Sequence, residues 1–527
     1  MTRQSFNEAA ELSRRQLLRI GAVGAIGAAG ALALGGCGAL PVRPAAGTPQ
    51  KTGGIFMHGA TGGGLKDTLD PHFPVTNPDI ARVNNLYEPL LFWNDKYELE
   101  HALAESLEVS KDALSWTVRL RKDVVFHHGK SLTPDDVMFT LSRLIDPKNT
   151  APGGVELAKV LDLENSKIVD SQTIRLQLKT PYAILDQLLA EYTTGIIPTD
   201  FDIAKPVGTG AFKYQSFLPG QSSHFNNFRD YWGKPAYVDE LYIYDFADDA
   251  AKVNALLAGQ VQSVDNLPTY LVDAIKRQGA SPLISDTGGW VPFTMRVDAA
   301  PYKDNRVRQA MRLIVDRQQM IDQALNGYGV LGNDMYSPFD EAYASDLPQR
   351  EQDIDKAKSL LKQAGQEGLE VELVTSSAVG SGGVESANVF VEQARKAGVK
   401  VRLNKADPNT FYGDQYLSWP FAQDFYNTRQ YIPQVAACAL KESPYNETHF
   451  DNPKFAKLVA DASREVDKDK RKELLHAAQK IEYDEGGFII WGFKRQVDAF
   501  SNTVQGFVPH RYLACSSFKF QRVSLTT

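Results

Sequence analysis

Cysteine is nearly absent from this chain of 527 residues, which contains only Cys37, Cys438 and Cys515. So few cysteines exclude a small fold stapled by disulfide bridges. Cys438 and Cys515 could pair in an oxidising compartment, but they fall in different predicted lobes. We therefore expect two unpaired thiols.

A strong excess of charge of one sign is also missing. The chain has 57 Lys and Arg against 64 Asp and Glu, which leaves a net charge of -7. No basic stripe interleaved with aromatic residues is present, so we expect no nucleic-acid partner. The hydrophobic fraction of 43% and the charged fraction of 23% are those of an ordinary globular protein.

Motifs of the common enzyme classes are missing as well. The chain has no His-Glu-x-x-His zinc motif, no Gly-x-Ser-x-Gly nucleophile elbow and no pair of histidines at zinc-binding spacing. Residues 129–131 (Gly-Lys-Ser) look like the end of a phosphate-binding loop, but that loop needs a glycine where Val124 stands. We therefore expect a protein that is not an enzyme, with no catalytic residue, no metal and no cofactor.

The N-terminus carries a sorting signal over residues 1–37. Arg14 and Arg15 precede an uncharged, Gly/Ala-rich apolar run over residues 20–34. This run is shorter than the roughly 20 residues that a transmembrane helix needs, so it indicates a secretion signal, and the twin arginine indicates the route for folded proteins. The Leu-Gly-Gly-Cys sequence that ends at Cys37 resembles a lipobox and predicts lipidation of that cysteine. Residues 38–51, rich in proline, then read as a tether.

The length predicts at least two lobes, because single cores stop growing at roughly 250–300 residues. Strand-like alternation occurs at residues 116–120, 174–178 and 399–403. Helical periodicity occurs between these segments, so we expect an α/β fold in which helices cover mixed sheets.

Three helices have clear boundaries. One begins after Thr133, which is followed by a proline and two aspartates, and a second is predicted as a single helix over about residues 305–325. A third runs from about Ile354 to Ala364 and is closed by Gly365.

At this point the chain resembles a known family, the family 5 solute-binding proteins of peptide, nickel and opine importers. The resemblance covers nearly everything after the tether. It rests on seven ordered blocks: residues 69–72 (Leu-Asp-Pro-His), 85–90 (Asn-Leu-Tyr-Glu-Pro-Leu), 125–137 (Val-Phe-His-His-Gly-Lys-Ser-Leu-Thr-Pro-Asp-Asp-Val), 207–212 (Val-Gly-Thr-Gly-Ala-Phe), 230–233 (Asp-Tyr-Trp-Gly), 301–310 (Pro-Tyr-Lys-Asp-Asn-Arg-Val-Arg-Gln-Ala) and 316–317 (Asp-Arg). One departure is His128, which replaces the more usual Asp.

The resemblance implies a two-lobed, periplasmic-binding-protein-like fold (type II, large cluster) with two crossover hinge segments. Lobe I would comprise residues 52–290 and 498–527, with a subdomain at about 97–198, and lobe II residues 291–497. The implied function is the substrate-binding lipoprotein of an ABC importer, which captures short peptides or similar amine-bearing solutes between its lobes. The implied partners are a permease with cytoplasmic ATPase subunits and, through the lipid at Cys37, the membrane. We expect a monomer outside the cytoplasm.

The family's peptide binders hold the ligand's amino group with an Asp that follows a Trp in lobe II, and Asp424 is the natural counterpart here. A desolvated ammonium needs a carboxylate close by. Trp419 lies five residues before Asp424, farther than usual, and the Asp-Pro that often follows is missing. The alternative is an Asp that caps a turn. Among the neighbouring aromatics, Trp419 and Tyr426 are the predicted ligand contacts, whereas Tyr412 and Tyr416 are expected to pack.

Two arginines are candidates for a ligand carboxylate. Arg296 stands where the family usually has Asn, near the lobe junction, and its planar guanidinium suits a carboxylate. The competing interpretation, which we favour, is that Arg296 pairs with Asp298 or another acid. Arg429 is the second candidate.

Other ligands and roles stay open. The same fold would serve for opines, oligosaccharides or nickel chelates, and a signalling lipoprotein that binds without import is an alternative of a different class.

Overall fold

The computed structural model describes residues 50–526. The twin arginine, Cys37 and all but the last two residues of the predicted tether lie outside the described residues. None of the described helices is long and apolar enough to span a bilayer. Cys438 and Cys515 are both buried and unpaired, which confirms the expectation for these two thiols.

The largest sheet has eight strands and is mixed, since β1 pairs in parallel with β10 and β11 while the other pairs are antiparallel. Helices α1 (Asn77–Leu86), α5 (Asp249–Leu257) and α6 (Val272–Arg277) pack against it. Its strands, in spatial order, are β12 (Ala280–Trp290), β19 (Gly492–Ser501), β11 (Ser263–Val264), β1 (Ile55–Thr61), β10 (Glu240–Phe246), β9 (Ser222–Asn227) and β8 (Phe212–Leu218), with β14 (Gly329–Leu331) paired to β19.

An antiparallel four-stranded sheet forms within residues 104–178. It is built from β4 (Ala104–Val109), β5 (Ser115–Leu120), β7 (Thr173–Leu178) and β6 (Leu161–Ile168), with the short hairpin β2 (Leu91–Trp93) and β3 (Leu99–His101) beside it. Helices α2 (Pro134–Leu144), α3 (Gly154–Val160) and α4 (Leu185–Leu188) belong to the same part of the chain, and a separate hydrophobic core fills it. We call the eight-stranded and four-stranded sheets with their helices lobe I.

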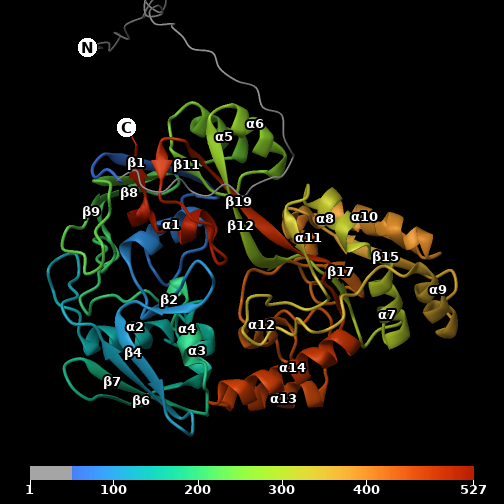
Figure 1. Cartoon of the computed structure of the whole chain (residues 1–527). Helices are drawn as coiled ribbons and strands as arrows, with labels where there is room; N and C mark the ends of the chain where they lie inside the picture. The colour runs from blue at the N-terminus through green and yellow to red at the C-terminus, as the bar shows by residue number, and fades with distance from the viewer. Residues whose placement is uncertain (1–49, 527) are drawn as a thin grey trace, which may run out of the picture. The chain divides into compact units, whose positions relative to one another are not determined.

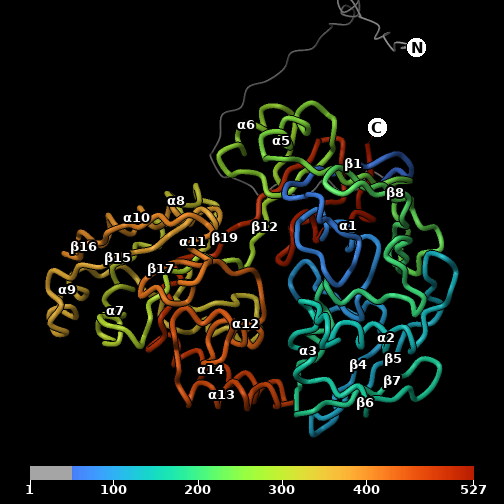
Figure 2. Tube along the Cα trace, turned by 180° about the vertical axis from the view of Figure 1, so that it is seen from behind, coloured from blue at the N-terminus to red at the C-terminus, as the bar shows by residue number. Residues whose placement is uncertain are grey.

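A five-stranded mixed sheet forms lobe II, in the order β16 (Lys400–Lys405), β15 (Glu370–Thr375), β17 (Phe421–Gln423), β13 (Phe293–Met295) and β18 (Phe488–Ile489). Its helices are α7 (Asn305–Ile314), α8 (Arg317–Ala324), α9 (Ile354–Gln363), α10 (Gly383–Lys396), α11 (Pro408–Phe411), α12 (Tyr431–Cys438), α13 (Pro453–Arg464) and α14 (Lys468–Glu485). The chain passes from β12 into β13 and returns from β18 into β19, so two adjacent strands join the sheets (Figure 1). Figure 2 shows the same pair of strands from behind.

The predicted strands all form, as β5, β7 and β16. The helix after Thr133 forms as α2, and the Asp136 carboxylate accepts hydrogen bonds from the Thr133 N–H at 3.0 Å and hydroxyl at 2.8 Å. The prediction of one helix over residues 305–325 is wrong. The chain breaks between α7 and α8 because Asp316 caps a new helix, its Oδ1 accepting from the Gln319 N–H at 3.0 Å.

Glycines in the block at residues 207–212 allow two backbone segments of lobe I to touch. Side chains at Gly208 and Gly210 would clash with the carbonyl oxygens of Leu86 and Asn85, at the end of α1. Only glycine fits there, which gives a physical reason for this block.

Helix α7 carries the side chains that satisfy the end of α14. Arg312 donates to four carbonyls of the segment at 482–488: Phe488 at 3.0 Å, Tyr483 at 2.9 Å, Gly486 at 2.8 Å and Glu482 at 3.4 Å. Arg308, one turn earlier, donates to Glu485 at 2.6 Å and to Gly486 at 3.2 Å. The last carbonyls of a helix lack partners within it and carry partial negative charge, so two arginines at this spacing suit the end of α14.

Candidate functional site

A cavity of about 380 Å³ lies between the two lobes. Lobe I contributes residues of β2, α3 and the segment at 187–193, and lobe II contributes α12 with the loops on either side of it. We call this cavity the cleft. Its most informative side chains are Trp93, Tyr97, Glu191 and Tyr192 from lobe I, and Arg429 and Tyr445 from lobe II.

The lobe I wall is aromatic with one acid. Trp93 and Tyr97 stack with their ring centroids 4.3 Å apart. Glu191 accepts hydrogen bonds from the Trp93 indole at 3.4 Å and from the Tyr512 hydroxyl. Burial raises the pKa of the Glu191 carboxyl. Rings of this kind offer a large contact area to a ligand with few rotatable bonds to order.

The lobe II wall presents a cation. Arg429 is exposed at the cleft, and within residues 50–526 it has no carboxylate within 4.0 Å. A guanidinium in that state can take a carboxylate through two parallel hydrogen bonds. The structure therefore brings Arg429, one of the predicted carboxylate ligands, to the cleft.

Asp424 follows β17 and is 4% exposed. Its Oδ1 accepts from the Tyr412 hydroxyl at 2.8 Å and from the Phe425 N–H at 2.7 Å, and its Oδ2 accepts from the Tyr416 hydroxyl at 2.8 Å. A carboxylate has about four acceptor positions, and the neighbouring Glu447 carboxyl lies within hydrogen-bonding reach of Asp424 as well. Tyr412 and Tyr416 were expected only to pack; their hydroxyls are the donors that hold Asp424.

A second acid, Glu447, completes this centre. The Tyr416 hydroxyl oxygen lies 2.8 Å from Asp424 Oδ2 and 2.9 Å from Glu447 Oε1, yet a phenol has one hydrogen and can donate to only one of them. Burial, and then the neighbouring Asp424, raise the pKa of Glu447 well above its usual range. A protonated Glu447 can donate to Tyr416, which donates to Asp424.

This arrangement predicts a pH dependence of stability that Glu447→Gln removes. Because the pKa of Glu447 is raised in the folded state, both states hold its proton at low pH, and folding stability falls as the pH rises above the unfolded value. A Gln amide donates to Tyr416 as the protonated acid does. We expect the variant's advantage in urea unfolding over the wild type to grow from pH 4 to pH 8.

Glu442→Gln is the matched control, because it removes one carboxyl from the same loop at an exposed position. Its unfolding curve is expected to follow the wild type across the pH range. Parallel pH profiles for Glu447→Gln and the wild type would contradict the protonated form of Glu447.

The crossing strand β12 anchors the segment that carries Asp424. Trp290, its last residue, exchanges two backbone hydrogen bonds with Tyr426, at 3.0 and 2.9 Å, and their rings stack with centroids 4.4 Å apart. The buried Tyr426 hydroxyl donates to Glu447 Oε2 at 2.6 Å and lies 3.1 Å from the carbonyl of Tyr445, a cleft residue. Tyr426 thus links the carboxylate centre to the cleft wall.

Four of the five predicted ligand-binding residues lie away from the cleft lining, namely Asp424, Trp419, Tyr426 and Arg296. Trp419 packs against the lobe II core and its indole donates to the Phe411 carbonyl at 3.4 Å. Arg296 forms two hydrogen bonds with Asp298, at 3.0 and 2.8 Å, and donates to the Ser418 carbonyl at 3.0 Å. The pairing with Asp298 is the one that we favoured from sequence. The hydrogen bond to Ser418 ties the loop that carries Tyr416 to the lobe II sheet.

Sequence reasoning missed the acids Glu447 and Glu191. Glu447 lies 23 residues after Asp424, in a loop without periodicity, and Glu191 follows a short helix. Neither position has a local pattern that separates it from the chain's many exposed acids. In the described part of the chain, no group of three or more His, Cys, Asp or Glu side chains is arranged to hold a metal ion.

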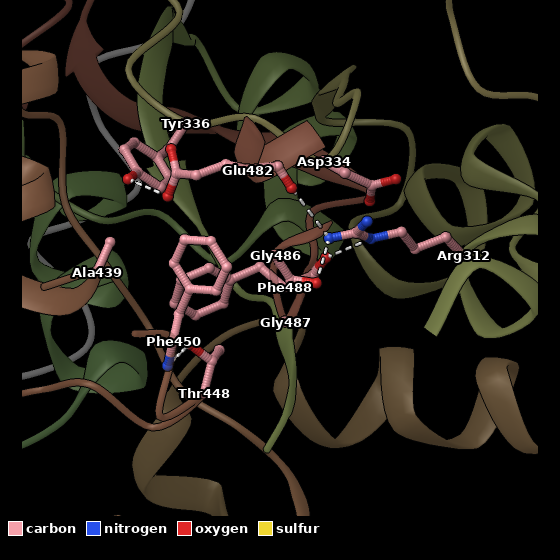
Figure 3. Close-up of a pocket in the computed structure, with 10 residues that line it drawn as sticks. All are labelled: Arg312, Asp334, Tyr336, Ala439, Thr448, Phe450, Glu482, Gly486, Gly487 and Phe488. Atoms are coloured by element: carbon pink, nitrogen blue, oxygen red, sulfur yellow. Dashed lines mark hydrogen bonds between the residues drawn. The ribbon is translucent and has the colours of Figure 1, made fainter. Parts of the chain in front are cut away.

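A second hollow in lobe II is too small to bind a solute. Its volume is about 10 Å³, room for one water molecule, and it is shown in Figure 3 with Arg312 and Glu482 among its lining residues. Burial lowers the pKa of Arg312 to about 9 and raises that of Glu482 to about 7. Glu482 accepts from the hydroxyls of Tyr336 at 2.6 Å and Tyr431 at 2.5 Å. The hydrogen bonds of Arg312 and Glu482 to neighbouring groups of the protein indicate that both side chains have a structural role.

The sequence and the fold of this chain are similar to those of known binding proteins. The chain is 26% identical to heme-binding protein A of Haemophilus influenzae, over 81% of this chain and 85% of that protein. It is 27% identical to di/tripeptide-binding protein 1 of Pseudomonas aeruginosa, over 72% and 78%. Its fold matches the periplasmic binding protein DppA of Helicobacter pylori in complex with the peptide STSA, with a TM-score of 0.73 and 21% identity over 90% of this chain and 99% of that one.

These similarities extend along the chain and agree with a two-lobed α/β fold. Residues 98–425, more than half of the chain, match the sequence model described as bacterial extracellular solute-binding proteins, family 5 Middle. The motifs, the fold and this match lead to one conclusion: the chain belongs to the family 5 bacterial extracellular solute-binding proteins.

Proposed function

We propose that the protein captures short peptides or similar amine-bearing solutes in the cleft and delivers them to the permease of an ABC importer. The observation that carries this proposal is Arg429, which lines the cleft with no carboxylate within 4.0 Å among residues 50–526. Asp424 does not line the cleft, so its role as the amine anchor requires the ligand's ammonium to extend beyond the cleft lining. A short peptide carries both complementary charges at its ends.

The cleft has the size and chemistry of a small-ligand site. Pockets of about 300–1,000 Å³ with aromatic walls and a few polar groups are typical, and the cleft falls within that range. Micromolar binding needs about 8 kcal/mol, which a buried ligand with two charged anchors can supply. A solute that touches both lobes favours the closed state, and the Trp290–Tyr426 pairing lies at the joint between them.

The lobe boundaries and the export route belong to the same proposal. We take residues 291–292 and 490–491 as the crossing segments, since the chain changes sheets there, which assigns residues 492–497 to lobe I instead of the lobe II expected from sequence. The twin arginine would direct export of the folded chain, and a lipid at Cys37 would hold the monomer at the membrane beside its permease. Metabolic labelling with palmitate, with Cys37→Ser as the negative control, tests the anchor; equal labelling of both would contradict it.

A thermal-shift screen of the chain that starts at Gly38 tests the ligand class. Di- to pentapeptides, their N-acetylated and C-amidated forms, opines, oligosaccharides, heme and nickel are compared. A ligand at a hundredfold excess over its Kd adds about 2.7 kcal/mol to the free energy of unfolding. Peptides with both termini free are expected to raise the melting temperature, and blocked ones are not.

Other outcomes separate the alternatives. A shift with only opines, heme, sugars or nickel would overturn the peptide assignment while keeping a solute receptor. If no compound shifts the melting temperature, the signalling lipoprotein becomes the better hypothesis.

A further inference from the structure

A second cavity, of about 170 Å³, lies entirely within lobe I. All of its lining residues fall within residues 84–232 and 512–522, so lobe II contributes none. Only Trp93 and Tyr192 line both this cavity and the cleft. We call it the lobe I cavity. It is separate from the place where the proposed solute binds.

Two cations line the lobe I cavity without a counter-ion. Within residues 50–526, neither Lys519 nor Arg522 has a carboxylate within 4.0 Å, and neither side chain donates a hydrogen bond. The Lys519 Nζ lies 3.1 Å from the centroid of the Phe92 ring, which covers one side of the ammonium. Burial, and then the nearby Arg522, lower the pKa of Lys519 to about 7, although the acids Glu88 and Glu100 act in the opposite direction. A partly buried cation in this state is costly, and a bound anion would relieve that cost.

The one acid that lines this cavity is already satisfied. The Glu88 carboxylate accepts from the Tyr231 hydroxyl at 2.6 Å, the Trp232 indole at 2.7 Å and the Thr209 hydroxyl at 2.9 Å. Burial raises the pKa of Glu88, while these three donors and the nearby Lys519 lower it. Glu88 offsets at most one of the two cations, so the cavity keeps an excess of positive charge.

A strained turn positions Lys519. Four consecutive non-glycine residues, Cys515 to Phe518, have φ between 47° and 59°, in the left-handed region. Buried contacts hold this turn: the Cys515 N–H donates to Asp498 at 2.6 Å, and the Asn85 amide donates to the Phe518 carbonyl at 2.8 Å. Ser517 lines the cavity and Lys519 directly follows the turn. Backbone strain that the surrounding structure maintains in this way is typical of ligand-binding segments.

We propose that the lobe I cavity is a second binding site, for a small organic carboxylate with an apolar body. Lys519 and Arg522 would bind the carboxylate, and the rings of Phe92, Trp93 and Tyr192 would contact the body of the ligand. The volume of about 170 Å³ is less than half that of the cleft, at about 380 Å³, which favours a ligand smaller than the proposed solute. The ligand differs in size from the proposed solute of the cleft, and its binding does not depend on that solute.

Benzoate is a suitable probe, and benzamide is its uncharged counterpart of nearly the same shape. Isothermal titration of the purified protein is expected to show benzoate binding and no measurable benzamide binding. Lys519→Met is expected to weaken benzoate by about tenfold or more, because a charge-assisted hydrogen bond is lost, and Arg522→Gln is expected to weaken it in the same direction. Benzoate binding to the wild type is expected to fall from pH 6 to pH 9, as Lys519 loses its proton.

Lys205→Met is the matched control, since it removes an exposed lysine of lobe I that lies outside the cavity lining. It is expected to keep wild-type benzoate affinity. Lys519→Met removes an unpaired, partly buried charge, so its melting temperature is expected to be no lower than that of the wild type, which separates lost binding from misfolding. Equal binding of benzoate and benzamide, undiminished binding by Lys519→Met, no binding of benzoate at millimolar concentration, or binding of inorganic phosphate in its place would each overturn the proposal.

Discussion

Asp424→Asn is expected to weaken the binding of a peptide with a free amino terminus by about a hundredfold, or roughly 3 kcal/mol. The substitution keeps the shape of the side chain, but it replaces one acceptor oxygen with an NH2 donor and removes the charge that would face the ligand's ammonium. In a desolvated site the uncompensated ammonium then carries its full burial cost. Isothermal titration with a peptide from the thermal-shift screen measures the loss.

Tyr412→Phe is the matched control. It removes one donor to Asp424 and leaves the carboxylate charge in place, so we expect a loss of less than about tenfold. An N-acetylated peptide should bind the wild type and Asp424→Asn equally weakly. If Asp424→Asn binds the free peptide within threefold of the wild type, Asp424 is not the amine anchor.

Arg312→Met is expected to lower the free energy of unfolding by about 3–5 kcal/mol. Arg312 is fully buried and serves four backbone carbonyls around the end of α14. Methionine fills a similar space but donates no hydrogen bond, so these carbonyls lose their donor. The hollow beside them has room for about one water molecule, which cannot replace all of the lost hydrogen bonds. Urea unfolding followed by circular dichroism measures the change.

Arg306→Met, on the same helix, is the control for the loss of an arginine from α7. Arg306 is exposed and pairs with Asp304, so its replacement is expected to change stability by less than about 0.5 kcal/mol. A loss below 1 kcal/mol for Arg312→Met would show that other groups satisfy the end of α14.

Much of the fold could be predicted because its signals are local. Alternation of apolar residues identified β5, β7 and β16, and the sequence around Thr133 identified the start of α2. The error at residues 305–325 shows the limit of periodicity. Val315 continues the apolar pattern of the first helix. The helix nevertheless ends at Ile314, because Asp316 adopts an extended conformation and caps the start of α8.

The candidate site was predicted in part. Asp424 came from the family resemblance and Arg429 from its neighbourhood, and their roles as ligand anchors stay predictions. The hydrogen bonds from the Tyr412 and Tyr416 hydroxyls to Asp424 could not be predicted, because the sequence does not distinguish a tyrosine that only packs from one whose hydroxyl donates. Glu447 reaches Tyr416 only because separate loops meet beside β17.

The sequence by itself determined the family, the α/β class, the absence of a disulfide framework and the helix boundaries that caps mark, because each depends on a local pattern or on composition. Only the tertiary structure decided which acid lies beside Asp424, that Arg296 ties a loop to the sheet, and that Lys519 and Arg522 line a cavity with no carboxylate within 4.0 Å. The physical reason is that charge, burial and hydrogen-bond partners depend on contacts between residues far apart in the chain. Such contacts exist only once the lobes are packed.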